Sequence, residues 1–266
     1  MKTLSLSPEA IQKEHDLKIV FTPLHGTTYE LVPASLRNWG FTNIHTVPEQ
    51  SIPDGDFPTV ASANPEEPAA FKMALDLARK IDADLAMACD PDGDRIGIAV
   101  KNDAGEWTLL NGNQTNIIFT EYIIRRKKEL NQLKGGEYTV KTIVTTELIK
   151  DIAEKNHIIC YDVYTGFKWI ADIIRKEGGE KFIGGGEESF GYMPGAFTRD
   201  KDGVSATSLM AEIAAWVKMQ NKTLYSFLKE IYAKYGFSQE RMIYIVRKGL
   251  SGAQEIKAMM EEFRHN

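Results

Sequence analysis

Cysteine is scarce in this 266-residue sequence, and long hydrophobic runs are absent. The two cysteines, Cys89 and Cys160, lie in apolar, strand-like stretches, so we expect packed thiols rather than a disulfide or a catalytic nucleophile. No apolar run reaches the roughly 18 residues that a membrane span requires. The opening segment also lacks the apolar centre of a secretory signal. We therefore expect a cytoplasmic protein with no membrane partner.

Charge of one sign is not concentrated in any part of the chain. The net charge is -5, and no long run of like charges occurs. Surfaces that bind nucleic acids are rich in clustered lysine and arginine, so we expect no nucleic-acid partner. Hydrophobic residues make up 43% and charged residues 26% of the chain, which is typical of a globular protein with one or two sizeable cores.

What the sequence does contain is an alternation of strand-like and helix-like segments. In the first 110 residues the hydrophobic patterns predict strands over 17–24, 41–47 and 83–89, helices over 27–40 and 66–81, and a hairpin over 96–110. Strands that alternate with helices are typical of a parallel α/β sheet.

A second α/β unit is predicted from about residue 110. Its expected strands cover 140–146 and 157–163, and a glycine-rich stretch follows at 181–192. Its expected helices cover 113–130, 147–156, 166–179, 203–220 and 223–236. The tail, 240–266, reads as one strand and one helix, which cannot bury a core alone.

We therefore predict two tandem α/β/α domains with mixed, mainly parallel sheets, spanning 1–109 and 110–236. Each domain is expected to have an independent core. Residues 237–266 would form a connecting segment or the beginning of a further domain.

Three carboxylates alternate along the stretch "DPDGDR", directly after the predicted strand 83–89. An EF-hand is excluded, because its loop needs glycine at position six and glutamate at position twelve, where Arg95 and Lys101 stand. Asp90, Asp92 and Asp94 could form a solvated turn, or they could converge on a hard cation such as Mg²⁺. Ligands of open α/β sheets bind at the carboxyl ends of strands, which favours the cation site. Arg95 beside it suits phosphate oxygens, so phosphoryl chemistry is indicated.

A second candidate site is the glycine-rich stretch "GGGEESFGY". It lacks the Lys-Ser/Thr pair of a Walker loop and the glycine order of a dinucleotide fingerprint. The stretch could be an ordinary turn, or it could be an exposed loop in which Glu187 and Ser189 hydrogen-bond sugar hydroxyls.

Taken together, these stretches resemble the α-D-phosphohexomutase family, the phosphoglucomutases and phosphomannomutases, along nearly the whole chain. "FTPLHGT" and "NPEEPAAF" look like elements of the family's second domain, "DPDGDR" like its magnesium loop, and "TGFKW" and "GEESFGY" like substrate loops of its third domain. By this resemblance, residues 1–109 correspond to domain II, residues 110–236 to domain III, and residues 237–266 to a connecting segment or the start of domain IV.

The resemblance also implies roles for individual residues. Asp90, Asp92 and Asp94 would ligate Mg²⁺, and Arg95 would meet the phosphate of the enzyme. Glu187 and Ser189 would hold sugar hydroxyls, with Thr165 and Gly166 as further substrate contacts. Lys201, in "TRDKDG", is a candidate for proton transfer or phosphate contact. His25, in "LHGT", is expected to be structural more often than catalytic.

The resemblance further implies parts that these 266 residues do not contain. The family's domain I carries a serine that becomes phosphoserine, and its domain IV carries a loop that grips the distal phosphate. Ser62, in "VASANPEEP", lies at a similar spacing from Asn-Pro, but Ala63 replaces the expected histidine and the segment follows "FTPLHGT", so we reject Ser62 as the phosphorylated serine. We expect domains I and IV of the same polypeptide to be the missing partners.

Three functions compete at this point. The resemblance implies a mutase that interconverts hexose 1-phosphate and hexose 6-phosphate through a phosphoserine and a 1,6-bisphosphate such as glucose 1,6-bisphosphate, with the 266 residues alone expected to be inactive. The second is a non-catalytic module that binds Mg²⁺ and sugar phosphates. A phosphatase with Asp90 as nucleophile is the third, and it is disfavoured because Asp90 does not follow the first strand and Asp94 replaces a Thr or Val.

Overall fold

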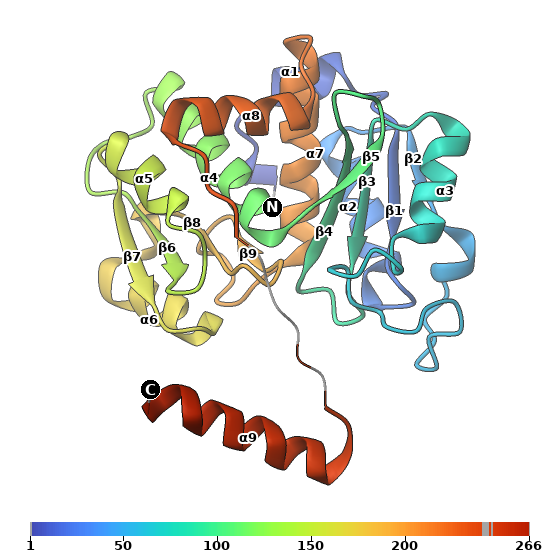
Figure 1. Ribbon diagram of the computed structural model, residues 1–266. Coiled ribbons are helices and arrows are strands. Elements are labelled where there is room, and N and C mark those ends of the chain that lie inside the picture. Colours follow the sequence, from blue (N-terminus) through green and yellow to red (C-terminus); the bar gives the residue numbers. More distant parts are fainter. Residues whose placement is uncertain (1, 241–244, 246, 266) are drawn as a thin grey trace.

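The computed structural model describes residues 2–240, 245 and 247–265, and it contains two sheets with helices between and around them (Figure 1). The first sheet has the strand order β2-β1-β3-β4-β5 and the second the order β7-β6-β8-β9. Both sheets are mixed, and most neighbouring strands of the α/β units run parallel, which confirms the predicted fold class.

The first sheet is built around a central strand that is buried on both faces. Its members are β1 (Ile19–Thr22), β2 (Ile44–Thr46), β3 (Leu85–Cys89), β4 (Ile96–Lys101) and β5 (Trp107–Leu110). Strands β1, β2 and β3 pair in parallel, whereas β4 and β5 form the predicted antiparallel hairpin. All five residues of β3 are buried, because helices cover both faces of the sheet.

Two helices of the first unit begin later than the sequence predicts. Helix α2 (Leu31–Trp39) is preceded by a 3-10 turn at Thr27–Tyr29. Pro33 explains the boundary, since proline is tolerated only in the first turn of a helix. Helix α3 (Lys72–Ile81) begins after a series of tight turns over 64–71. The first α-helix of the chain is α1 (Pro8–Lys13).

In the second sheet, one strand is displaced from its predicted position. The strands are β6 (Tyr138–Thr142), β7 (Ile159–Val163), β8 (Phe182–Gly186) and β9 (Tyr192–Met193). The prediction of a strand over 140–146 is wrong at its end, because the Thr142 and Thr145 hydroxyls bond at 2.7 Å and the chain turns. Ile143 and Val144 are consequently exposed in that turn.

The helices of the second unit are α4 (Gly112–Glu129), α5 (Leu148–Lys155), α6 (Phe167–Glu177), α7 (Gly203–Met219) and α8 (Leu224–Tyr235). Asn111 and Gln114 form a capping box that starts α4. Asp202 caps α7 by accepting hydrogen bonds from the Val204 and Ser205 N–H groups.

Helix α7 follows the second sheet in sequence but packs against α1 and α2 of the first unit and stands between the two sheets (Figure 1). Trp216 of α7 also makes an edge-to-face contact with Tyr122 of α4, with ring centroids 5.3 Å apart. One continuous hydrophobic cluster therefore runs from the first sheet through α7 to α4, α5 and α8. Each unit also has a smaller cluster of its own, around Phe71 in the first and Phe182 in the second, so the expectation of independent cores holds in part and the shared helical layer was not expected.

The tail contains the predicted helix, α9 (Gly249–His265). The strand predicted before it falls mainly on 241–244 and 246, which lie outside the described residues. Among the helices that the structure describes, none combines the length and apolar character needed to cross a membrane.

Candidate functional site: an acidic loop joined to a second loop

The acidic loop connects β3 to β4, and its shape is set by its own backbone. Gly93 donates its N–H to the Asp90 carbonyl at 3.0 Å. One carboxylate oxygen of Asp90 accepts the N–H groups of Asp94 at 3.1 Å and Arg95 at 2.9 Å. These bonds curl the loop, and one carboxylate oxygen each from Asp90, Asp92 and Asp94 lies within 4.8 Å of the others.

Burial makes this cluster costly without a cation. Asp90 is only 7% exposed, and desolvation together with the charges of Asp94 and Asp92 raises the pKa of Asp90 to about 7. Asp94 Oδ1 is buried and accepts no hydrogen bond from the described part of the chain. Three converging carboxylates with an unsatisfied buried oxygen fit a hard divalent cation such as Mg²⁺.

Two cationic side chains flank the carboxylates. Arg95 Nε lies 3.5 Å from Asp90 Oδ2 and 3.8 Å from Asp94 Oδ1, and Arg95 Nη1 lies 3.4 Å from Glu66 Oε1. Lys201 Nζ lies 2.8 Å from Asp94 Oδ2. The structure thus brings Lys201, which lies just before α7, to the acidic loop that precedes β4.

Glu187 is buried at the end of β8, contrary to the expectation of an exposed loop. Its side chain is 4% exposed, and its Oε1 accepts the Gly166 N–H at 2.6 Å. Its backbone carbonyl accepts a hydrogen bond from the buried Asn116 side chain at 2.7 Å. Burial raises the pKa of the Glu187 carboxyl, and the Gly166 N–H and the charge of Lys201 partly oppose this rise.

The residues predicted to contact a sugar come from two separate loops. Thr165 is exposed, and the adjacent Gly166 precedes α6 and joins Glu187. Ser189 is half-buried in the turn between β8 and β9. The neighbouring Glu188 instead faces β6, because its Oε2 accepts hydrogen bonds from the Thr142 and Thr145 hydroxyls at 3.3 and 3.1 Å.

Backbone contacts join the acidic loop to the turn that carries Glu187. Arg95 and Gly191 form an antiparallel bridge, and the Ile96 N–H donates to the Phe190 carbonyl at 3.0 Å. A separate backbone contact joins the acidic loop to the beginning of α7, where the Gly203 N–H donates to the Gly93 carbonyl at 3.0 Å. A Cβ on Gly203 would lie 2.6 Å from that carbonyl oxygen, so only glycine fits there.

Sequence reasoning missed several of these contributors. Gly203 shows no signal beyond its place at the start of a helix, and Asn116 reads as one more polar residue of an amphipathic helix. Glu66 lies in the quoted "NPEEPAAF" motif, but nothing in the sequence indicates that it reaches Arg95. Each of the three acts across a large sequence separation.

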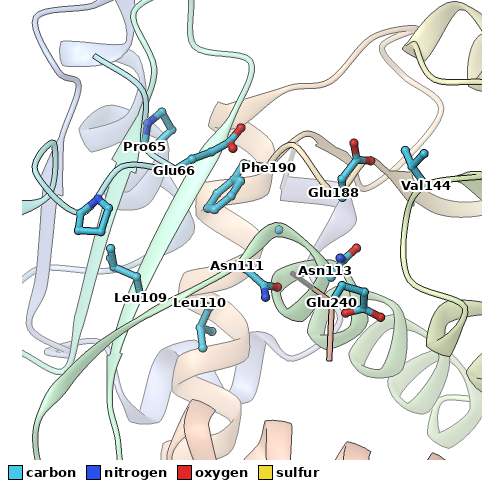
Figure 2. Close-up of a pocket in the computed structure, with 12 residues that line it drawn as sticks. Pro65, Glu66, Leu109, Leu110, Asn111, Asn113, Val144, Glu188, Phe190 and Glu240 are labelled. Carbon is cyan, nitrogen blue, oxygen red and sulfur yellow. The ribbon is translucent and has the colours of Figure 1, made fainter. Parts of the chain in front are cut away.

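A pocket of about 450 Å³ lies beside this site rather than in it (Figure 2). Glu66, Glu188 and Phe190 line one side of it, and Leu109 and Asn111 lie on the opposite side. None of the three clustered aspartates belongs to its lining. The acidic loop, rather than this pocket, is therefore the candidate site.

Two further residues that were considered from the sequence, His25 and Ser62, have structural partners, and a third, Cys89, is buried. The His25 ring nitrogens lie 3.0 Å from the Ile52 carbonyl and 2.8 Å from the Thr59 hydroxyl. Ser62 donates its hydroxyl to Glu67 at 2.8 Å. Cys89 is buried, which raises the pKa of its thiol to about 12 and keeps it protonated.

The chain is similar to known phosphohexomutases in sequence and in structure. It is 38% identical over 252 residues to the phosphoglucomutase of Staphylococcus aureus strain MRSA252, covering 94% of this chain and 45% of that protein. The chain therefore spans about half the length of the curated relatives it matches.

Solved structures share the fold. The Paramecium phosphoglucomutase parafusin superposes with a TM-score of 0.64 at 19% identity, covering 88% of this chain and 40% of that one. The Aspergillus fumigatus N-acetylphosphoglucosamine mutase S69A, in complex with glucose 1,6-bisphosphate, gives 0.54 at 16% identity, covering 88% and 48%.

Family models match most of the chain. The model of the α/β/α domain II of phosphoglucomutase/phosphomannomutase matches residues 2–105, and that of domain III matches residues 111–235. These two regions contain the acidic loop and the Glu187 turn respectively. The chain belongs to the phosphoglucomutase/phosphomannomutase family.

Proposed function

We propose that these residues form the central part of a phosphohexomutase, which interconverts hexose 1-phosphate and hexose 6-phosphate through a phosphoserine and a 1,6-bisphosphate intermediate. The observation that carries the proposal is the physical junction of the acidic loop with the Glu187 turn, through the Arg95–Gly191 bridge and the Ile96–Phe190 hydrogen bond. Phosphoryl transfer requires charge stabilisation and acceptor positioning at one place, and this junction supports both.

In the proposed enzyme, Asp90, Asp92 and Asp94 would hold Mg²⁺, which neutralises charge on a phosphoryl group. Arg95 is oriented by Asp90 and Glu66, so its remaining donors would contact the phosphate of the enzyme. A guanidinium suits this role because it remains charged at all physiological pH values.

The second loop would bind the sugar. Glu187, fixed by Gly166, would accept hydrogen bonds from sugar hydroxyls, with Ser189 and Thr165 as neighbouring contacts. Lys201 would contact phosphate or transfer a proton, because its ammonium pairs with Asp94 of the acidic loop and its charge also acts on Glu187.

We infer that the division of labour follows the family's domains, with 1–109 as domain II, 110–236 as domain III and 237–266 as a connecting segment or the start of domain IV. The phosphoserine loop and the distal phosphate loop would come from domains I and IV. The glucose 1,6-bisphosphate bound by the Aspergillus mutase supports a sugar bisphosphate as intermediate and activator of the whole enzyme.

Calorimetry with glucose 1-phosphate, on the 266-residue chain, tests this proposal. We expect weak binding that requires Mg²⁺ and is lost in both Asp92→Asn and Glu187→Gln, and the exposed Glu30→Gln serves as a charge-matched control. A coupled assay with glucose 1,6-bisphosphate should detect no conversion to glucose 6-phosphate by these residues alone. Binding that neither variant weakens would contradict the assignment of the site.

A further inference from the structure

Lys201 and Arg95 hold the acidic loop in different ways. The Arg95 guanidinium contacts Glu66, Asp90 and Asp94, and its backbone is bridged to Gly191. Lys201 makes one ion pair among the described residues, with Asp94. Arg95 is therefore fixed by several partners, whereas the Lys201 ammonium depends on one.

The backbone of Lys201 is nevertheless anchored. Its N–H donates to Asp200 Oδ1 at 2.9 Å, and the next residue, Asp202, caps α7 and donates its own N–H to the Tyr192 carbonyl at 3.2 Å. The aliphatic stem lies over Gly191, where a Cβ would come within 2.6 Å of Lys201 Cδ. A fixed backbone with a flexible four-carbon stem lets the ammonium move while its starting point stays in place.

Asp94 is the carboxylate that pairs with Lys201 and would also bind a cation. Its Oδ2 faces Lys201 at 2.8 Å, while its buried Oδ1 makes no hydrogen bond to any residue that the structure describes. Its ligand oxygen lies within 4.8 Å of those of Asp90 and Asp92. A divalent cation bound at the free Oδ1 would draw the carboxylate charge away from Oδ2 and would repel the ammonium there, so cation binding weakens the ion pair of Asp94 with Lys201.

We propose that Lys201 is an exchangeable counter-ion, whose ammonium holds Asp94 in the state seen here and is released when Asp94 serves a divalent cation. The released ammonium becomes available to Glu187 and to anionic groups of a substrate. Cation binding would thereby prepare the sugar side of the site through a side chain that starts from α7. This inference rests on the proposed function, because it takes the three aspartates as the cation ligands.

Binding of Mn²⁺, followed by electron paramagnetic resonance, tests the exchange without an activity assay, since carboxylates that suit Mg²⁺ also bind Mn²⁺. Removing a competitor that forms one partly exposed ion pair should tighten binding by about fivefold in Lys201→Met. Lys72→Met is the matched control, because Lys72 forms a single ion pair with Asp76 at 2.6 Å on α3. The control should stay within about twofold of the wild type.

The position of Lys201 gives a second, independent measurement. In a crystal structure of the Mn²⁺-loaded wild-type chain, we expect Lys201 Nζ to lie outside ion-pair distance of Asp94, and this readout does not depend on any variant folding. Lys201 still paired with Asp94, or a Lys201→Met affinity equal to that of Lys72→Met, would overturn the exchange while leaving the cation site intact. Failure of the wild type to bind millimolar Mn²⁺ would overturn the exchange and the proposed function together.

Discussion

The two halves of the site are built in opposite ways. The acidic loop takes its curl mainly from contacts within six consecutive residues, the Asp94 and Arg95 N–H groups on Asp90, while Thr27, Gly191 and Gly203 attach its backbone to the rest of the fold. The Glu187 loop is assembled from distant segments, because Glu187 joins Gly166 through its side chain and Asn116 through its backbone. The acidic loop can therefore keep its curl through local hydrogen bonds, whereas the Glu187 loop depends on the tertiary fold.

The contact between the acidic loop and the beginning of α7 should be the most sensitive point. Gly203→Ala places a Cβ 2.6 Å from the Gly93 carbonyl oxygen and 3.1 Å from Cys89 Sγ, so we expect a loss of about 2–3 kcal/mol of unfolding free energy, the range of overpacked sites. We also expect the affinity for Mn²⁺ to fall, because the acidic loop must shift. Urea unfolding and Mn²⁺ binding measure these effects.

Gly55→Ala provides the control for this substitution, since a Cβ at the exposed Gly55 meets no atom within 4 Å. Its unfolding free energy should change by less than about 0.5 kcal/mol. An equal, small effect at both glycines would show that this contact is pliable and that the acidic loop keeps its shape without α7.

Within the acidic loop, Asp92→Asn should weaken Mn²⁺ binding without affecting the Glu187 loop. Asp92 is exposed and contributes one of the three clustered carboxylates, so we expect at least about a tenfold loss of Mn²⁺ affinity with the fold retained. Hydrogen exchange at the Gly166 amide should not change. If that amide also loses protection, the local character of the acidic loop is contradicted.

Glu187→Gln tests the other loop, which is held together by the hydrogen bond between Glu187 and Gly166. A neutral amide accepts the Gly166 N–H less strongly than a carboxylate, so protection of that amide should fall by about fivefold to tenfold, equivalent to roughly 1 kcal/mol. Hydrogen exchange followed by NMR measures it. Glu188→Gln is the control in the same turn, because Glu188 bonds Thr142 and Thr145 and not Gly166. An equal loss of Gly166 amide protection in both variants would contradict a specific hydrogen bond between Glu187 and Gly166.

The same contrast explains what could be predicted from the sequence. The alternation of strands and helices and the convergence of Asp90, Asp92 and Asp94 follow from short-range patterns, and the structure contains both. The burial of Glu187, the ion pair of Lys201 with Asp94 and the packing of α7 on the first unit were not predictable. These features depend on contacts between segments that are far apart in the sequence, and the periodicity of a single sequence does not indicate such contacts.

The smallest effect expected at the two loops comes from a change in α7 beyond the site. Glu212 is buried there, and it accepts hydrogen bonds from Ser5, the Leu6 N–H at 2.8 Å and Tyr122 at 2.7 Å. Burial raises the pKa of Glu212 in the folded state. The protonated carboxyl therefore adds stability that is fully present below the unfolded pKa of about 4.3 and is lost as pH rises through the folded pKa.

Glu212→Gln should consequently flatten the decline of unfolding free energy with rising pH, by at most about 1.4 kcal/mol per pH unit. Urea unfolding between pH 4 and 8 measures the slope, and Mn²⁺ affinity and Gly166 exchange should stay at wild-type values. An unchanged slope would mean that Glu212 does not titrate differently in the folded and unfolded chains. A change in Mn²⁺ affinity or in Gly166 exchange would show that Glu212 of α7 also influences the site.

The position of α7 also has a consequence for the order of events on the ribosome. The first sheet is complete once β5 has been made at Leu110, but the helix that covers one of its faces ends at Met219. At about 5–20 residues per second, the intervening segment takes roughly 5–20 s to synthesise. During that interval the nascent chain exposes apolar surface that α7 later buries, so we expect the first unit to be prone to aggregation until α7 has been made.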